Sequence, residues 1–489
     1  MIISRHGGSL ELLTRDELYD IHLASMDVLE HTGVVVMLDE ALRLLDNLGA
    51  SVDYKTKRAL IPSDLVKEAI QKTPSSFVLY ARNPKNKLRV GGNRVYFLDG
   101  GLTSYVVDLA GIRRPATIKD VEDLTRLYDF LDNVDMLAAG VFPTDVPEKV
   151  QHVHAYLKKL ENTEKVCLYV YFARGGVVAN DLIEMASIVA GGPDELRKKP
   201  MIMGWENPIS PMSHGKEQTE MVLEFAKRGL PVHIGPAIQS GSTGPVTLAG
   251  VLVQQNVEVL SGIVIAQSVT EQGRRSPIVY GAVPALTDVR YGTTVYGAAE
   301  AALMNIASAQ IARYYSLPCR GNGGATESKT EDIQAGYESA ITLLMASLAG
   351  ANLIMNATGG ALEPGIGSMS YEKAVIDNDM ATVVSRILKG IDVSDNTLAV
   401  EVLEEVGPLG HFLSHKHTRE FFKKEHIIPP LADRRDYTTW RKDGSKELKR
   451  VARETASKIL QEHKPAPLED SIKKELEAIV KKVEKRELT

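Results

Sequence analysis

The feature that most constrains the fold is a regular alternation of apolar, strand-like runs with helix-length segments, from Thr117 to about Lys389. Strands this apolar are buried on both faces, and alternation with helices is typical of a parallel sheet covered by helices. We expect an α/β fold in which eight such units close into a TIM-type (β/α)8 barrel, with a doubly wound open sheet as the alternative. Seven strand candidates stand out: 134–142, 165–172, 200–206, 231–238, 277–283, 317–321 and 351–356.

The eighth strand is less evident, and it comes either from the turn-rich region before Thr117 or from a short run at 397–402. The rest of the chain elaborates the barrel. The predicted divisions are an N-terminal α+β extension at 1–88, a β-hairpin cap at 89–116, the barrel at 117–425, and an irregular segment with a C-terminal helical tail at 426–489.

The last helical segment carries an apolar stripe, because Ile472, Leu476, Ile479, Val480 and Val483 recur on one face. Such a stripe needs a partner. The candidates are the body of the chain itself and a second copy of the chain.

Bulk properties narrow the class of protein. The chain has 489 residues, 44% of them hydrophobic and 25% charged, and a net charge of -6, which argues against a nucleic-acid-binding surface. Cys167 and Cys319 lie in apolar runs and are expected to be buried thiols. The N-terminus lacks a signal pattern, and no apolar run approaches the length of about 18 residues that spans a bilayer. We therefore expect a cytoplasmic protein.

Two glycine-rich loops, 321–324 and 359–367, follow neighbouring strand candidates. Glu327 comes shortly after the first loop, and Glu363 lies within the second. A parallel barrel brings the carboxyl ends of its strands to one mouth, where barrel enzymes do their chemistry. The loops do not match phosphate-binding or dinucleotide-binding patterns, and tight turns are their simplest explanation. Glu327 and Glu363 are equally compatible with helix caps or ion pairs.

Lys329 allows a separate hypothesis. A lysine near a barrel strand end can form a Schiff base, which would make the protein a lyase or aldolase. Glu327 and Glu331 are close to it in sequence, so a solvated or ion-paired lysine is the alternative.

Four further motifs appear in order along nearly the whole chain, and together they resemble the trimethylamine methyltransferase superfamily. They are Val107-Asp108-Leu109 with Arg113-Arg114-Pro115, Glu327-Ser328-Lys329 with Gly336-Tyr337-Glu338, the run from Met355 to Glu363, and Gly410-His411-Phe412-Leu413 with His415-Lys416-His417-Thr418. The resemblance implies an elaborated barrel that moves a methyl group from a tertiary or quaternary amine to cobalt(I). The cobalt belongs to a corrinoid on a separate small protein.

The chain differs from the trimethylamine branch of that family, which carries pyrrolysine inside the barrel, because every position here is a standard residue. The resemblance therefore implies the non-pyrrolysine, glycine betaine methyltransferase-like branch. Its substrates are quaternary amines such as glycine betaine, proline betaine or carnitine. The loop 356–362 differs from what the betaine members lead us to expect, so the exact amine stays open.

This chemistry needs a dry pocket for a cation, and aromatic faces with a carboxylate suit that task. Trp205 is the strongest candidate, with packing in the barrel core as the alternative. Glu327 and Glu363 would pair with the ammonium or carry a proton, and Lys329 would line the cavity. The predicted substrate-binding residues are Phe142, Tyr171, Phe172, Trp205, Glu206, Gln239, Tyr280, Asn322 and Asn356, and the predicted corrinoid-approach loops contain Gly323, Gly324, Gly359 and Gly360.

A quaternary ammonium leaves as a neutral amine and needs no metal, unlike thiol or alcohol substrates. The sequence offers no convincing zinc ligand set: His152 and His154 point apart on a helix, and His415 and His417 lack a third ligand. The expected partners are thus a small corrinoid protein, a methylated amine and further copies of the chain. A Schiff-base lyase and a binding protein without turnover are the competing hypotheses.

Overall fold

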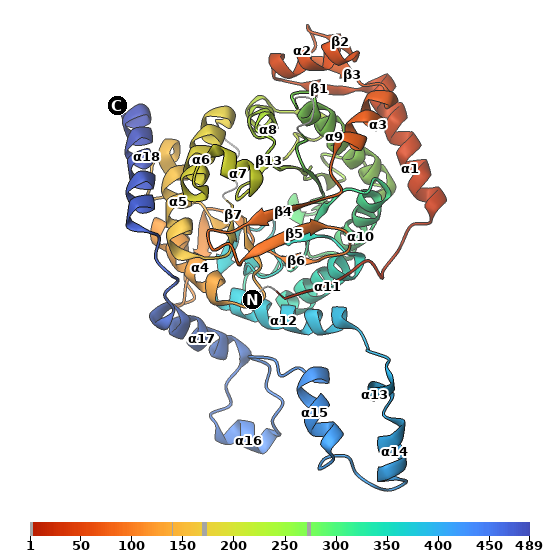
Figure 1. Ribbon diagram of the computed structural model, residues 1–489, viewed down its shortest axis with the longest axis vertical. Helices are drawn as coiled ribbons and strands as arrows, with labels where there is room; N and C mark the ends of the chain where they lie inside the picture. The colour runs from red at the N-terminus through yellow and green to blue at the C-terminus, as the bar shows by residue number, and fades with distance from the viewer. Residues whose placement is uncertain (1–2, 139, 169–173, 271–274) are drawn as a thin grey trace.

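The computed structural model describes residues 3–138, 140–168, 174–270 and 275–489 (Figure 1). Parallel strands form one consecutive series in its centre. Six of them make one sheet in the order β13-β15-β17-β20-β21-β6, and an isolated bridge between Leu98 and Met136 continues the series to the parallel pair β10-β12. The eight strands are β6 (Tyr96–Phe97), β10 (Met136–Leu137), β12 (Val166–Cys167), β13 (Gly204–Glu206), β15 (Val232–Ile234), β17 (Ile278–Gly281), β20 (Cys319–Asn322) and β21 (Leu353–Met355).

A helix follows each of these strands, and Figure 1 shows the helices as a ring around them. The result is an α/β fold with the strand and helix order of a (β/α)8 barrel. Within the described residues, seven of the eight neighbouring strand pairs have pairing contacts, and β12 with β13 is the exception. The ring consists of α4 (Ile118–Phe130), α5 (Glu148–Asn162), α6 (Gly175–Ala190), α8 (Lys216–Lys227), α9 (Leu248–Gln267), α10 (Ala299–Tyr314), α11 (Ile333–Ala349) and α12 (Tyr371–Lys389).

The eighth strand comes from the turn-rich region, because β6 pairs in parallel with β21 through Leu353–Tyr96 and Ile354–Phe97. The other candidate, the run 397–402, is helical: it falls in α13 (Asp395–Leu398) and α14 (Val400–Val406). The parallel series thus begins inside the segment 89–116 that we expected to be a hairpin cap.

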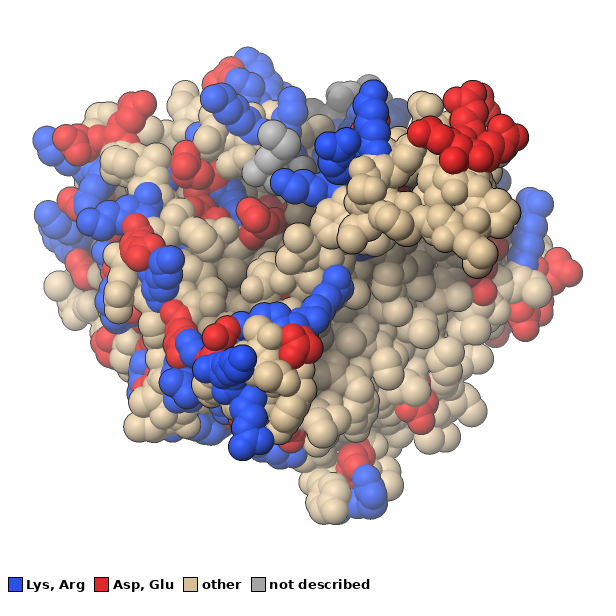
Figure 2. Space-filling view, turned by 90° about the horizontal axis from the view of Figure 1, so that it is seen from below, with Lys and Arg blue, Asp and Glu red and all other residues tan. Residues whose placement is uncertain are grey.

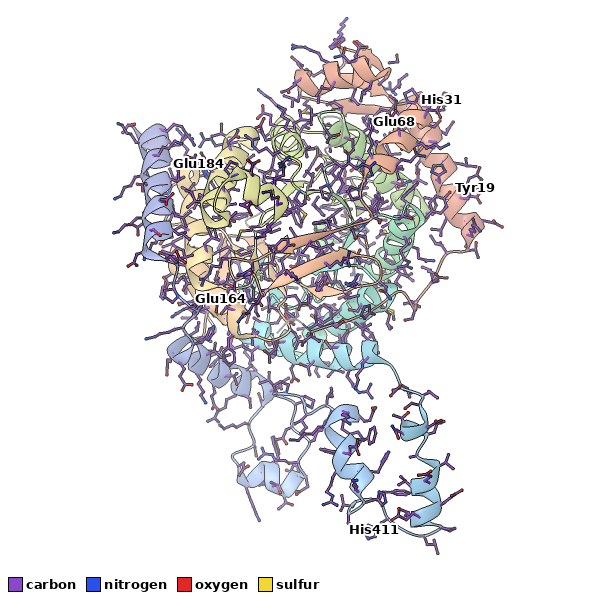
Figure 3. The ribbon with its side chains drawn as sticks, in the orientation of Figure 1. Tyr19, His31, Glu68, Glu164, Glu184 and His411 are labelled. Atoms are coloured by element: carbon purple, nitrogen blue, oxygen red, sulfur yellow. The ribbon has the colours of Figure 1, made fainter. Side chains whose placement is uncertain are left out.

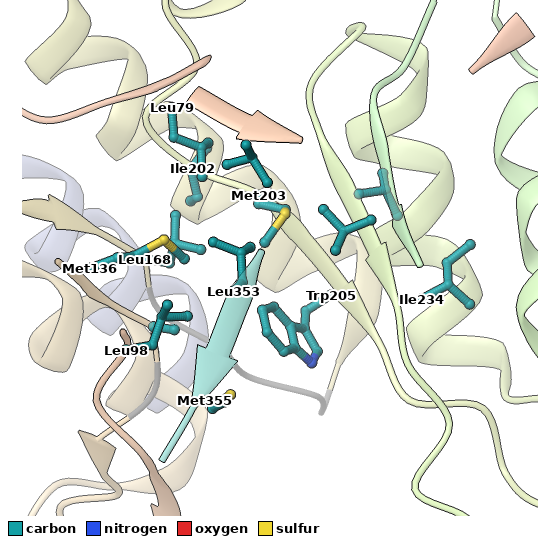
Figure 4. Packing of buried hydrophobic residues seen from close by; sticks show 14 of the residues in the cluster. Leu79, Leu98, Met136, Leu168, Ile202, Met203, Trp205, Ile234, Leu353 and Met355 are labelled. Carbon is teal, nitrogen blue, oxygen red and sulfur yellow. The ribbon is translucent and has the colours of Figure 1, made fainter. Parts of the chain in front are cut away.

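One end of the strand series is covered by the hairpin of β4 (Ser76–Tyr80) and β5 (Lys87–Gly91). The backbone N–H of Tyr80 donates to the carbonyl of Pro200, which precedes β13, at 2.8 Å. The hairpin therefore lies at the amino-terminal ends of the strands, and the side chains between them form the core. Figure 4 shows that core, to which Leu98, Met136, Leu168, Met203, Trp205, Leu353 and Met355 contribute.

Small sheets surround the opposite, carboxyl-terminal end of the strands. These sheets surround the carboxyl ends of the strands, which is where proteins of this architecture place their functional sites. The first is β7 (Gly101–Thr103) with β11 (Gly140–Val141). The second orders β22 (Ala361–Leu362), β23 (Ser368–Ser370), β8 (Tyr105–Val107) and β9 (Arg113–Pro115), and the third orders β16 (Gln239–Ser240), β18 (Ala285–Asp288) and β19 (Thr293–Val295).

The N-terminal extension packs against the ring of helices. Its helices are α1 (Arg15–Asp27), the π-helix Val28–Thr32, α2 (Asp39–Leu48) and α3 (Ser63–Lys72). Its strands β1 (Val34–Val36), β2 (Ser51–Asp53) and β3 (Arg58–Leu60) form a sheet with β14 (Ser213–His214), which belongs to the loop after β13. Thr14 and Glu17 form the capping box that the sequence indicates at the start of α1. Because β1 pairs in parallel with β14, this extension is tied to the loop that follows β13.

Helix α9 corrects one expectation. It is long and apolar enough to cross a membrane by length and composition, whereas the sequence analysis found no such run. However, 78% of its most apolar stretch is buried inside the protein, and polar side chains such as Gln255 and Asn256 make hydrogen bonds within the core. Its apolar character is therefore explained by burial between strands and neighbouring helices.

The C-terminal helices dock on the body of the same chain, which resolves the choice left open by the apolar stripe. Helix α18 (Asp470–Leu488) packs on α5 and α6 and buries Leu476, Ile479, Val480 and Val483. Lys482 of this helix pairs with Glu184 of α6 at 2.9 Å, and Figure 3 shows Glu184 on the side of the body that α18 covers. Helix α17 (Leu448–Glu462) packs on α12 and α4.

Residues 391–428 form a projecting segment that we call the arm. It contains α13, α14 and α15 (Lys416–Glu425), none of its residues is buried, and Figures 1 and 3 show it extending away from the barrel, with His411 near its far end. Arg386 of α12 holds its base by donating to Glu425, at 2.8 Å to the carbonyl and 2.9 Å to the carboxylate. The short helix α16 (Tyr437–Lys442) follows after the chain has returned to the body.

A buried ion pair ties the N-terminal segment to the strand series. Arg5 lies 2.6 Å from Asp135, and both side chains are almost fully buried. We expect Arg5→Met to lower the free energy of unfolding by about 3 kcal/mol or more, because it leaves the Asp135 carboxylate buried without its cation. Thermal unfolding measures the change. Combining it with Asp135→Asn removes the unpaired charge and should recover part of the loss, whereas a single variant as stable as the parent would contradict this role.

Candidate functional site

Three polar or aromatic side chains meet inside the strand series near its carboxyl end: Trp205, His233 and Arg320. Trp205 and His233 are register partners on β13 and β15, and their rings stack with centroids 3.7 Å apart and planes 25° apart. Arg320 on β20 pairs in register with Gly281 on β17, and its guanidinium carbon lies 5.9 Å from the centre of the Trp205 ring. We call these three residues the inner cluster.

Gly281 provides the space for the inner cluster. A Cβ at this position would lie 2.3 Å from Nε2 of His233 and 2.4 Å from the Cα of Gly235, and one at Gly235 would lie 2.2 Å from the same ring. A strand glycine often marks a close approach of this kind. The imidazole therefore lies over Gly281, next to the strand that carries Arg320.

The inner cluster contains unsatisfied polar atoms. Both ring nitrogens of His233 and Nε of Arg320 are buried and have no hydrogen-bond partner. Nη1 of Arg320 donates to the carbonyl of Ala282 at 2.9 Å, and among the described residues none forms an ion pair with this guanidinium. Since buried polar groups in native proteins are nearly always satisfied, these atoms make the inner cluster our candidate for a binding site.

Burial sets the charge states in the cluster. It lowers the pKa of His233 well below its ordinary value, and the nearby Arg320 cation adds to this effect, so the ring is neutral at physiological pH. Burial also lowers the pKa of Arg320, to about 10, which still leaves it charged at neutral pH. The cluster thus combines one buried cation with a neutral imidazole and an indole.

Polar groups from other strands lie at the same carboxyl end of the strand series. Asn356 donates from Nδ2 to Oδ1 of Asn322 at 2.6 Å and accepts from the backbone N–H of Gly101 at 3.2 Å. Asp99, after β6, accepts from the backbone N–H of Ala138 at 2.7 Å, and its second carboxylate oxygen lies 4.0 Å from Nζ of the buried Lys159. Asn322 and Asn356, both predicted from sequence, are therefore brought together.

Glu206 and Tyr280, also predicted, lie on the helix-facing side of their strands. Alternate residues of a strand point to opposite faces, so Glu206 points away from the side that carries Trp205. Its carboxylate pairs with Nδ1 of the buried His214 at 2.8 Å, while the hydroxyl of Tyr280 donates to Asn256 of α9 at 3.2 Å. Burial opposes charge on His214, but the Glu206 carboxylate outweighs it and raises the pKa of His214.

The two predicted carboxylates have backbone and side-chain partners. Glu327 accepts from the backbone N–H groups of Tyr296 at 2.6 Å and Gly297 at 3.0 Å, and burial raises its pKa. Glu363 accepts from Nε of Arg113 at 2.7 Å and from the hydroxyl of Ser368 at 2.6 Å. Glu327 thus fixes the loop that carries Tyr296, and Glu363 holds a sheet at the rim. Lys329 is exposed.

The glycine-rich loops are held together by close backbone contacts. A Cβ at Gly324 would lie 2.3 Å from the carbonyl of Asn356, and one at Gly359 would lie 2.2 Å from the backbone nitrogen of Gly100. Gly360 (φ +79°) lies similarly against Ser370, and Gly323 against Leu343 of α11. These contacts explain the glycines as turns that permit close backbone approach.

A buried ion pair on α12 joins the two glycine-rich loops. Lys373 and Asp377 lie 2.8 Å apart, one turn apart on the helix. Nζ of Lys373 donates to the carbonyl of Gly324 at 3.0 Å, while the Asp377 carboxylate accepts from the backbone N–H of Gly360 at 2.8 Å. Burial raises the pKa of Asp377 to about 6, although Lys373 opposes the shift. The loops are therefore positioned by a helix that sequence reasoning did not connect to them.

Of the remaining predicted residues, two lie at the rim and two lie outside the part of the chain that the structure describes. Phe142 follows β11 and is partly buried, and Gln239 in β16 accepts from Thr287 at 3.2 Å, both in small sheets at the rim. Tyr171 and Phe172 lie outside the described residues. Across the described ranges, no group of three or more His, Cys, Asp or Glu side chains is placed to hold a metal ion. Both cysteines are free and buried, which confirms that prediction.

Sequence reasoning missed His233, Arg320, Asp99 and Lys159. A signal for two of them was available, because His233 and Arg320 interrupt the apolar strand candidates 231–238 and 317–321. A charged residue inside a buried strand is rare unless it is paired or functional.

The inner cluster depends on Gly281, and this gives a test. We expect Gly281→Ala to lower the thermal midpoint and to disturb His233, because the new Cβ would meet both the imidazole and the backbone of Gly235. The matched control is Gly336→Ala in α11, where a Cβ meets nothing within 4 Å and alanine favours the helix. Circular dichroism on heating distinguishes them, and equal midpoints for the two variants would contradict the close packing.

Comparison with known proteins adds an independent finding. The family model described as trimethylamine methyltransferase (MTTB) matches residues 1–488. The chain is 36% identical to a glycine betaine methyltransferase of Desulfitobacterium hafniense strain Y51, over 96% of each chain. It is 37% identical to the trimethylamine methyltransferase MttB of Desulfitobacterium hafniense strain DCB-2, over 98% of this chain and 95% of that one. It is also 36% identical to an MttB of Methanosarcina barkeri strain Fusaro, over 98% and 96%.

Among solved structures, the chain is similar to the monomethylamine methyltransferase MtmB of Methanosarcina barkeri. The sequences are 13% identical, the TM-score is 0.47, and the alignment covers 92% of this chain and 95% of that one.

Proposed function

Because the chain belongs to the trimethylamine methyltransferase family, we propose that it is a methyltransferase that moves a methyl group from a methylated amine to a corrinoid on a small partner protein. The observation that carries the proposal is the inner cluster, a buried set of unsatisfied polar groups at the carboxyl end of the strands. That is where parallel α/β enzymes place their chemistry. The corrinoid supplies cobalt(I), the nucleophile that accepts the methyl group.

We further propose a quaternary amine as the methyl donor. Such an amine leaves in neutral form, so the chain needs to bind and orient it and to exclude water, without donating a proton. The structure supports this division of labour, since Glu327 is occupied by backbone N–H groups and Glu363 by Arg113. The Trp205 face opposite His233 is the aromatic surface we assign to the ammonium group.

The approach of the corrinoid is proposed to occur over the glycine-rich loops. Gly323, Gly324, Gly359 and Gly360 are buried and lie against other backbone, so they allow the tight folding of these loops and do not themselves face the ring. The Lys373–Asp377 pair holds the loops in place at the carboxyl end of the strands, which is the face we assign to the corrinoid protein. The protein is proposed to act in the cytoplasm.

The Schiff-base hypothesis finds less support. Lys329 is exposed, and a lysine that forms Schiff bases is usually activated by apolar surroundings or a neighbouring cation.

The direct test mixes the protein, a small corrinoid protein reduced to cobalt(I), and one amine at a time. We expect a quaternary amine to convert the cobalt(I) spectrum to that of methylcobalt(III), and Lys329→Ala to do so at the parental rate. Absence of methylcobalt with every methylated amine would contradict the proposal, and borohydride trapping of a carbonyl compound on Lys329 would favour the lyase.

The arm supports a further proposal, that the protein forms a homo-oligomer through it. Its apolar side chains are exposed, which is costly for a soluble monomer. Helix α11 offers a complementary stripe, with Ile333 88%, Tyr337 53% and Ile341 45% exposed at four-residue spacing. Figure 2, seen from the side on which the arm projects, shows a hollowed surface with few charged groups. The exposed apolar residues of the arm are Ile391, Val393, Leu398, Val400, Leu403, Leu409, Phe412, Leu413, Phe422 and Ile428.

We assign a second copy of this chain as the occupant, because the arm and the α11 stripe belong to one chain and complement each other. Light scattering of the variant Leu403→Asp with Leu413→Asp should then show the mass of a single chain, since two charges would be buried in the contact. The control is Leu23→Asp on α1, where leucine is 47% exposed, and it should keep the parental mass. Equal masses for both variants would contradict the proposal.

A further inference from the structure

Arg320 is unusual among the buried cations of this protein. Arg5, with which it can be compared, is equally buried but has the Asp135 carboxylate at 2.6 Å and further hydrogen bonds to Asn133 and Ser385. Arg320 is only 4% exposed, and its one described hydrogen bond is to a backbone carbonyl. Burying a charge without a counter-ion is strongly unfavourable. A structural arginine would have the kind of partner that Arg5 has.

Among the described residues no anion pairs with Arg320, but a second group able to donate lies beside it. His233 is neutral, so one of its ring nitrogens carries a proton whichever tautomer is present, and neither nitrogen has a partner. Its Nε2 lies over Gly281, the register partner of Arg320. The free Nε–H of Arg320 on β20 and the imidazole on β15 therefore lie on either side of β17, at the same end of the strand series.

We propose that Arg320, with His233 beside it, binds a carboxylate of the methylated amine, so that the substrate is a zwitterion carrying both a quaternary ammonium and a carboxylate. This inference rests on the proposed function. The resemblance already implies betaines as one class of substrate, and the structure adds the residues of this chain that would select a carboxylate over trimethylamine, since relatives are named for both glycine betaine and trimethylamine. A guanidinium is suited to a carboxylate, since its planar N–H groups match the two oxygens.

The position of Trp205 fits a short zwitterion. Its ring lies 5.9 Å from the guanidinium carbon of Arg320, and its one described stacking partner is His233. If the carboxylate of a short zwitterion binds Arg320, its ammonium, a few bonds from that carboxylate, would lie near the indole of Trp205. Glu327 contributes as a positioning residue, because it fixes the backbone of Tyr296, and burial raises the pKa of that phenol although the nearby Arg320 opposes the shift. A trimethylamine molecule would leave Arg320 without an anion.

The test measures binding to the full-length protein by calorimetry, without any corrinoid protein. Glycine betaine, proline betaine and carnitine are compared with glycine betaine methyl ester, choline and trimethylamine. The ester keeps the ammonium and removes the negative charge but adds one methyl group, whereas choline removes the carboxylate without added bulk. We expect at least one carboxylate-bearing amine to bind about 100-fold more tightly than the matching cation without a carboxylate, as loss of a charge-assisted hydrogen bond predicts.

Variants then assign the effect to Arg320. With Arg320→Gln the preference for the carboxylate over the ester should fall to near unity, and with Arg320→Lys it should be partly retained. The thermal midpoint of ligand-free Arg320→Gln should equal or exceed that of the parent, because an unpaired buried charge has been removed. The control is Arg313→Gln in α10, whose arginine donates to Ala349 away from the cluster, and which should keep the parental ligand preference.

The outcomes separate this inference from the proposed function. If trimethylamine or choline binds as well as the betaines and supports methyl transfer, the carboxylate site is wrong while the methyltransferase stands. If a carboxylated amine binds through Arg320 but no amine yields methylcobalt, the site stands and the proposed function fails. If Arg320→Gln does not fold, the ester comparison on the parent protein still decides, and equal affinities there would overturn the proposal.

Discussion

The site depends on the registration of parallel strands, whose alternate side chains point to one common interior. Trp205 and His233 lie at the same level on β13 and β15, while Arg320 on β20 is level with Gly281 on β17. A shift of one residue in any of these strands would turn its side chain toward the helices. Glycine at position 281 is part of the same constraint, because the imidazole of His233 occupies the space a side chain would need. The chemistry of the interior is therefore a consequence of strand pairing.

Burial explains why the interior is suited to a small charged ligand. Burial lowers the pKa of both groups: His233 is neutral as a result, whereas the pKa of Arg320, about 10, still leaves it charged, with no counter-ion among the described residues. In such surroundings an electrostatic contact is stronger than it is in water. The cost of the unpaired cation is met by the packing of the rest of the barrel, which is the usual relation between a functional site and its scaffold.

The loops around the strand ends are fixed from outside the barrel. The Lys373–Asp377 pair on α12 binds both glycine-rich loops, and Glu327 binds the loop before α10. Glu327, a candidate acid in the sequence, thus holds backbone, while Glu363 accepts from the side chains of Arg113 and Ser368. This arrangement suits the methyl transfer that we propose, which depends on positioning and charge and needs no proton from the protein.

Local periodicity, capping chemistry and motifs were enough to predict the order of strands and helices from Thr117 to Lys389, the capping box at Thr14 and Glu17, the burial of both cysteines and the family. The folded chain was needed to find that β6 supplies the eighth strand, that Glu206 and Tyr280 face the helices, and that His233 lies beside Arg320. Such facts depend on which strands pair and in which register. That is set by contacts between residues far apart in the chain, which no local pattern records.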